Sequence, residues 1–153
     1  MTHSSTIASR LAAGVQPFVT TPAIRFIAHL GLCAAYIQGP LTKILDFDAA
    51  LGEMNHFGLQ PAALFAVAVI VFELLASAMI LAGILRWLAA LGLAAFTLAA
   101  TFIALRFWEL APGQERFMAT NAFFEHLGLA GAFLLVAWYD LDRRNEAGGE
   151  PLP

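Results

Sequence analysis

One acidic side chain, Glu73, lies in the middle of an otherwise apolar stretch that covers residues 61–85. About 20 apolar residues can cross a bilayer as a helix, and a charged residue at the centre costs about 2.5 to 3.5 kcal/mol of insertion free energy. A carboxyl group there could bind a ligand, carry a proton or form a hydrogen bond between helices. Because an amide or hydroxyl would form such a bond at lower cost, Glu73 is the first candidate for a functional residue.

Four further polar residues are predicted to lie near the depth of Glu73. Each helical residue advances 1.5 Å, and Glu73 lies about twelve residues from the end of its segment. The same count along the next two antiparallel segments reaches Thr97 and Thr101, and then Glu125 and His126. Glu125 and His126 lie about 100° apart around a helix, so spacing leaves open which one faces the other helices. His126 could share a proton with Glu73, whereas threonines are typical of interhelical hydrogen bonds.

A cation, two aromatic rings and an acid follow one another at residues 106–109. Arg106 and Glu109 are spaced for an ion pair, and Trp108 is typical of an anchor at the membrane surface. Arg106 could instead bind an anionic or carbonyl-bearing head group. Lys43, between the first two apolar segments, is a second predicted interface anchor.

The residues predict neither a metal site nor a covalently bound cofactor. His29 should lie at a different depth from His126, Glu73 and Glu125, so these four side chains are not expected to share a metal ion. The single cysteine, Cys33, rules out an intrachain disulfide or a CxxC pair.

Composition places these residues in an integral membrane protein. Of 153 residues, 60% are hydrophobic and only 12% are charged, whereas about a quarter are charged in soluble domains. No run of basic residues could follow a phosphate backbone, which argues against nucleic-acid binding. Four apolar segments are predicted to span the membrane, at about residues 22–38, 61–85, 87–107 and 119–139.

The expected fold is an all-α, integral membrane four-helix bundle in residues 22–139, because a spanning segment must satisfy its own backbone hydrogen bonds. Between the first two spans, apolar residues recur at helical spacing and predict a short amphipathic helix. This loop helix could lie on the membrane surface or cover a site between the spans.

Basic residues predict the orientation. Five arginines lie on the side of both termini, against Lys43, Arg106 and Arg116 on the other side: Arg10, Arg25, Arg86, Arg143 and Arg144. This bias places both termini in the cytoplasm. Residues 1–21 are expected to form a cytoplasmic N-terminal tail, and residues 140–153 a disordered cytoplasmic tail.

The order of several short motifs resembles the DoxX family of small four-helix membrane proteins, over about residues 24–138. The motifs are Arg25 and Phe26; Gly39; residues 43–47; Gly58 and Pro61; Glu73; residues 81–83; Arg86; Phe96 and Thr97; Ala100 and Thr101; Phe107 and Trp108; and residues 124–131. The resemblance implies a multi-pass protein of the bacterial inner membrane. It also implies an association with quinone-linked or oxidant-defence redox systems.

From this resemblance and Glu73, we expect the membrane component of a redox system that contacts quinone or another lipophile near Glu73. Arg106 and His126 would make secondary contacts. Two alternatives remain open: a non-catalytic membrane anchor or assembly partner, and a component of a small proton-coupled transporter. The expected partners are the lipid bilayer, a redox protein and a second copy of the chain, since small-residue helix faces also permit self-association.

Overall fold

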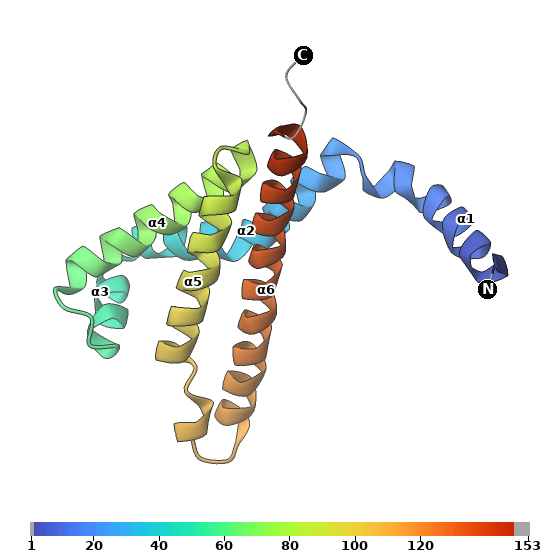
Figure 1. Cartoon of the computed structure of the whole chain (residues 1–153). Helices are drawn as coiled ribbons and strands as arrows, with labels where there is room; N and C mark the ends of the chain where they lie inside the picture. Colours follow the sequence, from blue (N-terminus) through green and yellow to red (C-terminus); the bar gives the residue numbers. More distant parts are fainter. Residues whose placement is uncertain (1, 149–153) are drawn as a thin grey trace.

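The part of the chain that the structure describes is almost entirely helical. The structure is a computed structural model that describes residues 2–148, and the side chains of residues 9–146. Its elements are α1 (Thr2–Val19), α2 (Pro22–Leu45), α3 (Phe47–His56), α4 (Ala62–Ala82), α5 (Arg86–Ala104), the 3-10 helix η1 (Phe107–Glu109) and α6 (Gln114–Gly148). Figure 1 shows α1 extending away from the other helices.

Within the described residues, three helical segments are long and apolar enough to cross a membrane: α4, α5 together with η1, and α6. A fourth span is present if Ser9–Val19 and α2 form one broken span, because this pair passes the same test but is bent by 76°. On α4, exposed apolar side chains recur every three to four residues, as suits a lipid-facing stripe: Leu64, Val67, Val71 and Leu75. The predicted class, an all-α membrane bundle, is confirmed.

The first predicted span is longer than expected. Residues 22–38 were the predicted bounds, but α2 continues through Pro40 to Leu45. The Thr21 hydroxyl oxygen accepts a hydrogen bond from the Ile24 amide at 3.2 Å and so caps the start of the helix. The other three predicted spans coincide with α4, α5 and part of α6 to within a few residues at each shared end.

Both segments predicted as tails contain helix. Within residues 1–21, α1 forms where Leu11, Val15 and Phe18 repeat on one helical face. Within residues 140–153, disorder is the wrong prediction for residues 140–148, because α6 continues to Gly148. One cause is local, since Asp140 accepts a hydrogen bond from Arg144 Nε at 3.1 Å, four residues further along the helix. Residues 149–153 lie outside the described part of the chain.

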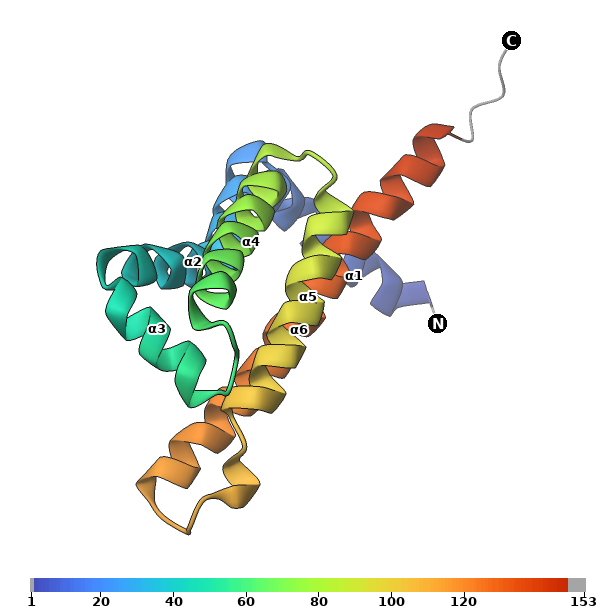
Figure 2. The same ribbon diagram turned by 90° about the vertical axis from the view of Figure 1, so that its left-hand side faces the viewer.

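The core lies where four helices meet. Figures 1 and 2 show α5 and α6 side by side as a long hairpin, with α2 and α4 packed together at an inclination to it. Small side chains of α5 allow a close approach, and Tyr36 of α2 packs edge-on against Phe133 of α6 with ring centroids 5.3 Å apart. The buried core cluster consists of Cys33, Tyr36, Ala76, Ile80, Ala89, Ala90, Leu93, Ala94, Phe133 and Ala137.

The predicted amphipathic loop helix is present as α3. Its N-cap is Asp46, whose carboxylate accepts a hydrogen bond from the Ala49 amide at 3.0 Å. Ala50 and Met54 of α3 are buried against Ala66 of α4, so α3 is attached to the bundle by its apolar face. This packing favours the interpretation of α3 as a cover over the space between the helices.

Candidate functional site

A cavity of about 520 Å³ lies among α2, α3, α4, α5 and α6. Its wall is mostly apolar, with carbon surfaces contributed by residues such as Phe65, Val69, Phe96 and Leu129. Six side chains bring polar groups to this wall: Tyr36, Lys43, Glu53, Glu73, Thr97 and His126. The cavity therefore combines a large apolar surface with a few polar groups, which is typical of small-molecule sites.

Glu73 contributes a carboxyl group from the middle of α4. It lies next to Gly39 of α2, because a Cβ added to Gly39 would be 3.9 Å from Oε2 of Glu73, an ordinary contact distance. Glu73 is half-buried, and its carboxyl group forms no hydrogen bond or ion pair with any residue in the described part of the chain. Because desolvated carboxylates usually have partners, this carboxyl group is available to a ligand or a proton.

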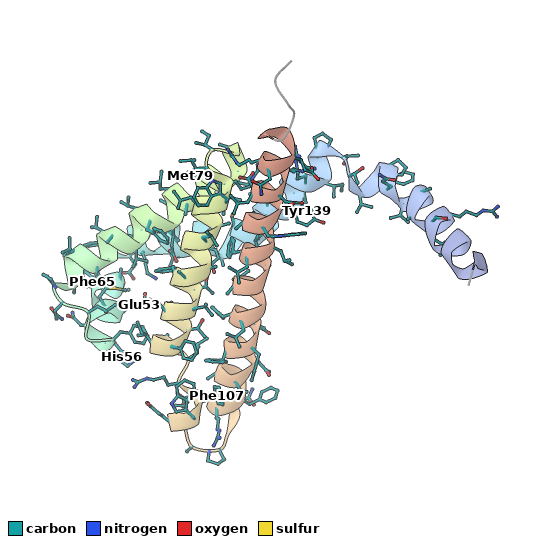
Figure 3. All side chains as sticks on the ribbon, in the orientation of Figure 1. Glu53, His56, Phe65, Met79, Phe107 and Tyr139 are labelled. Atoms are coloured by element: carbon teal, nitrogen blue, oxygen red, sulfur yellow. The ribbon has the colours of Figure 1, made fainter. Side chains whose placement is uncertain are left out.

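Lys43 and Glu53 form an ion pair in the same cavity wall. Lys43 Nζ lies 2.7 Å from Oε2 of Glu53, and the two side chains are 19% and 42% exposed. Lys43 is thus held by α3, in the wall of the cavity that also contains Glu73. Figure 3 shows Glu53 on α3 and Phe65 near the start of α4 at the same edge of the molecule. The sequence predicted Lys43 as a membrane-interface anchor, and the structure places it in the cavity wall.

Tyr36 and Thr97 join α2 to α5 through a short hydrogen bond between their hydroxyl groups. The Thr97 hydroxyl also donates to the Leu93 carbonyl at 2.6 Å, so its proton is already used. Tyr36 must therefore donate to Thr97. Thr101, which was predicted at the same depth, is buried, and its hydroxyl donates to the Thr97 carbonyl at 2.6 Å. Thr97 lines the cavity, whereas Thr101 does not.

The structure distinguishes His126 from Glu125. His126 is half-buried and lines the cavity, while Glu125 is exposed and lies outside it. His126 Nδ1 lies 2.6 Å from the Ala122 carbonyl, which can only accept a hydrogen bond, so Nδ1 carries the proton. The neutral ring then has Nε2 as an acceptor for a ligand. Glu73 and His126 therefore line one cavity from two helices.

Arg106 and Trp108 lie outside this cavity, near the connection between α5 and α6. Arg106 Nη1 forms an ion pair with Glu109 Oε1 at 3.1 Å, and both side chains are about half exposed. The rings of Phe107, Trp108 and Phe123 contact one another edge to face. Figure 3 shows Phe107 at the end of the hairpin opposite Tyr139. This arrangement is that of an aromatic anchor with an ion pair.

Sequence reasoning missed two contributors to the site. Tyr36 was overlooked because a lone tyrosine in an apolar segment gives no periodic signal, and Glu53 because a charged residue of an amphipathic helix is expected to face solvent. The available clue was that Lys43 and Glu53 are oppositely charged and only ten residues apart. Within the described residues, no group of three or more His, Cys, Asp or Glu side chains could hold a metal ion.

The chain matches the model of a known protein family. The model of the DoxX family matches residues 24–106, which is more than half of the 153 residues. The chain belongs to the DoxX family. The DoxX match covers α2 to α5 and so includes Tyr36, Lys43, Glu73 and Thr97, while His126 lies beyond it. No curated protein and no solved structure matches this DoxX protein significantly.

Proposed function

We propose that this DoxX protein is the membrane component of a redox system and holds quinone or a similar lipophile in the cavity beside Glu73. The observation that best supports this proposal is the cavity itself. Its volume of about 520 Å³ falls within the range of roughly 300 to 1,000 Å³ that is usual for ligand sites. Its apolar wall suits a hydrophobic ring and chain.

The polar groups of the wall suit the carbonyl oxygens of such a ligand. Carbonyl oxygens accept hydrogen bonds, and the Lys43 ammonium group or a protonated Glu73 carboxyl group can donate them. His126 can exchange a proton through Nε2. Glu73 and His126 would thus bind the ligand and deliver or accept the protons that accompany its reduction and oxidation.

We further propose that a partner protein supplies the electrons. Cys33 is the single cysteine of the chain, so the chain has no dithiol pair of its own. Its thiol is also buried. The proposed location is the bacterial inner membrane with both termini in the cytoplasm. Supporting this orientation, Arg25, Arg86 and Arg143 line one groove near the bend before α2 and the later part of α6.

Native mass spectrometry of the protein in mild detergent tests the ligand proposal. The wild-type protein should retain a quinone-sized mass, and Glu73→Gln should lose it while remaining folded. Glu125→Gln is the matched control. This substitution removes the same charge at nearly the same predicted depth, but from a side chain that lies outside the cavity. A lipophile retained equally by both variants would contradict a role for Glu73 in binding.

A second variant tests the cavity without altering its charge. Ala100 lines the cavity from α5, and Ala100→Phe should exclude the ligand by filling the space. If wild type, Glu73→Gln and Ala100→Phe all retain a protein partner but no small molecule, the protein is an anchor and the ligand proposal is wrong. Proton flux in liposomes that depends on Glu73, with no bound lipophile, would instead identify a transporter component.

A further inference from the structure

A second cavity, also about 520 Å³, lies where the bend between α1 and α2 meets the start of α5 and the later part of α6. Three arginines and one histidine line it, against one carboxylate: Arg25, Arg86, Arg143, His29 and Asp140. It shares no lining residue with the cavity beside Glu73.

The carboxylate in this cavity is already engaged. Asp140 accepts hydrogen bonds from Arg144 Nε at 3.1 Å and from the Trp87 amide at 3.3 Å, and Arg86 Nη1 lies 3.9 Å from it. Arg86 is fixed further, because its Nε donates to the Ile80 carbonyl at 2.9 Å. Asp140 therefore neutralises charges that are already beside it and leaves the cavity with an excess of positive charge.

Arg25 and Arg143 carry that excess. Both side chains are exposed, and neither forms an ion pair with a carboxylate in the described part of the chain. They approach the same space from different helices, α2 and α6. Two guanidinium groups facing one space can together bind a phosphate group, since each offers paired N–H donors.

The remainder of the wall suits a lipid. Ile24, Leu135 and Val136 provide an apolar surface next to the arginines. Tyr139 also lines the cavity, and Figure 3 shows it on the upper part of α6, close to where α2 begins. An apolar surface beside basic and aromatic residues is the pattern expected for a phospholipid at the boundary between acyl chains and head groups.

We propose that this cavity binds an anionic phospholipid, with the phosphate between Arg25 and Arg143 and an acyl chain against Leu135 and Val136. The proposal concerns a different site from the cavity beside Glu73 and does not depend on the proposed redox role. The bound lipid would hold the bend between α1 and α2 against α6. It would fix the basic end of the bundle at an anionic membrane surface.

Lipid binding to the full chain can be measured by native mass spectrometry in detergent. Phosphatidylglycerol and phosphatidylcholine with identical acyl chains are the two probes, and wild type should retain the anionic lipid preferentially. The double variant Arg25→Gln/Arg143→Gln should weaken phosphatidylglycerol binding by about 10- to 30-fold, since each basic side chain near anionic lipid strengthens binding by roughly fivefold. Arg86 is left intact because its bonds support the fold.

The matched control is Arg10→Gln/Arg116→Gln, which removes the same charge outside this cavity. It should leave phosphatidylglycerol binding within about twofold of wild type. Equal retention of the two lipids, or equal loss in both double variants, would overturn the proposal. Inorganic phosphate is also tested as a competitor of phosphatidylglycerol. If millimolar phosphate occupies the site and phosphatidylglycerol does not, the site takes a soluble anion and the lipid assignment is wrong.

Discussion

Removing the hydrogen bond between Tyr36 and Thr97 should destabilise the bundle unequally, depending on which hydroxyl is removed. Tyr36 donates to Thr97, and Thr97 donates onward to the Leu93 carbonyl. Tyr36→Phe leaves Thr97 with its bond to Leu93. Thr97→Val has nearly the same shape but leaves the Tyr36 hydroxyl without its acceptor.

Burial sets the size of the difference. Thr97 is 1% exposed and Tyr36 is 5% exposed, so bulk water cannot readily replace the lost partner. Interhelical hydrogen bonds in membrane proteins contribute about 0.6 kcal/mol on average and up to about 1.7 kcal/mol, which is the expected cost of Tyr36→Phe. Leaving a buried hydroxyl unpaired costs about 1 to 3 kcal/mol, so Thr97→Val should be the more damaging change. The double variant leaves no hydroxyl unpaired, so it should cost about as much as Tyr36→Phe plus the loss of the Thr97 bond to Leu93, which is less than the sum of the two single variants.

The assay is equilibrium unfolding of the purified protein in mixed micelles titrated with dodecyl sulfate, followed by circular dichroism. Thr120→Val is the matched control. The Thr120 hydroxyl donates to the Arg116 carbonyl at 2.7 Å, which repeats the intrahelical bond of Thr97 without a partner on another helix. Thr120→Val therefore measures the cost of losing the intrahelical bond alone.

Two results would refute the reasoning. If Thr97→Val lowers the free energy of unfolding no more than Thr120→Val does, the bond to Tyr36 does not stabilise the bundle. If the effects of Tyr36→Phe and Thr97→Val simply add in the double variant, the two hydroxyls are not coupled energetically.

Two further predictions concern the ends of α4 and α5. Asp140→Ala should lower the free energy of unfolding by about 1 kcal/mol because Asp140 accepts from the Trp87 amide and caps α5, whose own N-cap residue makes no side-chain bond; thermal unfolding should show little change for the exposed Asp142→Ala. Gly83→Ala should destabilise by about 1 kcal/mol, since Gly83 has φ of +78° at the end of α4. Gly52→Ala, in the middle of α3 with open space around it, should instead stabilise slightly, and the opposite order of the two glycine variants would contradict this account.

The local features of the fold could be predicted from the sequence. Glu73 and the apolar residues around it identify α4 as a span, and the repeat of apolar residues identifies α3, because both signals depend only on neighbours along one helix. The depth count, which uses only the rise per residue, also selected Thr97 and His126. The structure places both in the wall of the cavity that contains Glu73.

Some structural features could not be predicted because they depend on contacts between residues that are far apart in the sequence. Residues 140–148 were predicted to be disordered because they are polar, but Asp140 contacts the start of α5, 53 residues away along the chain. Composition cannot reveal such a contact. Whether the first span continues through Gly39 and Pro40 was likewise left open by the sequence, and in the structure Pro40 is buried within α2.

The sequence by itself determined that the chain is an all-helical, multi-pass membrane protein, because hydropathy is a property of each segment alone. Only the tertiary structure decided that His126 and not Glu125 lines the cavity, and that Lys43 pairs with Glu53. It also decided that Tyr36 joins α2 to α5. These outcomes depend on how each helix is rotated and inclined against its neighbours, which is set by packing among all the helices together.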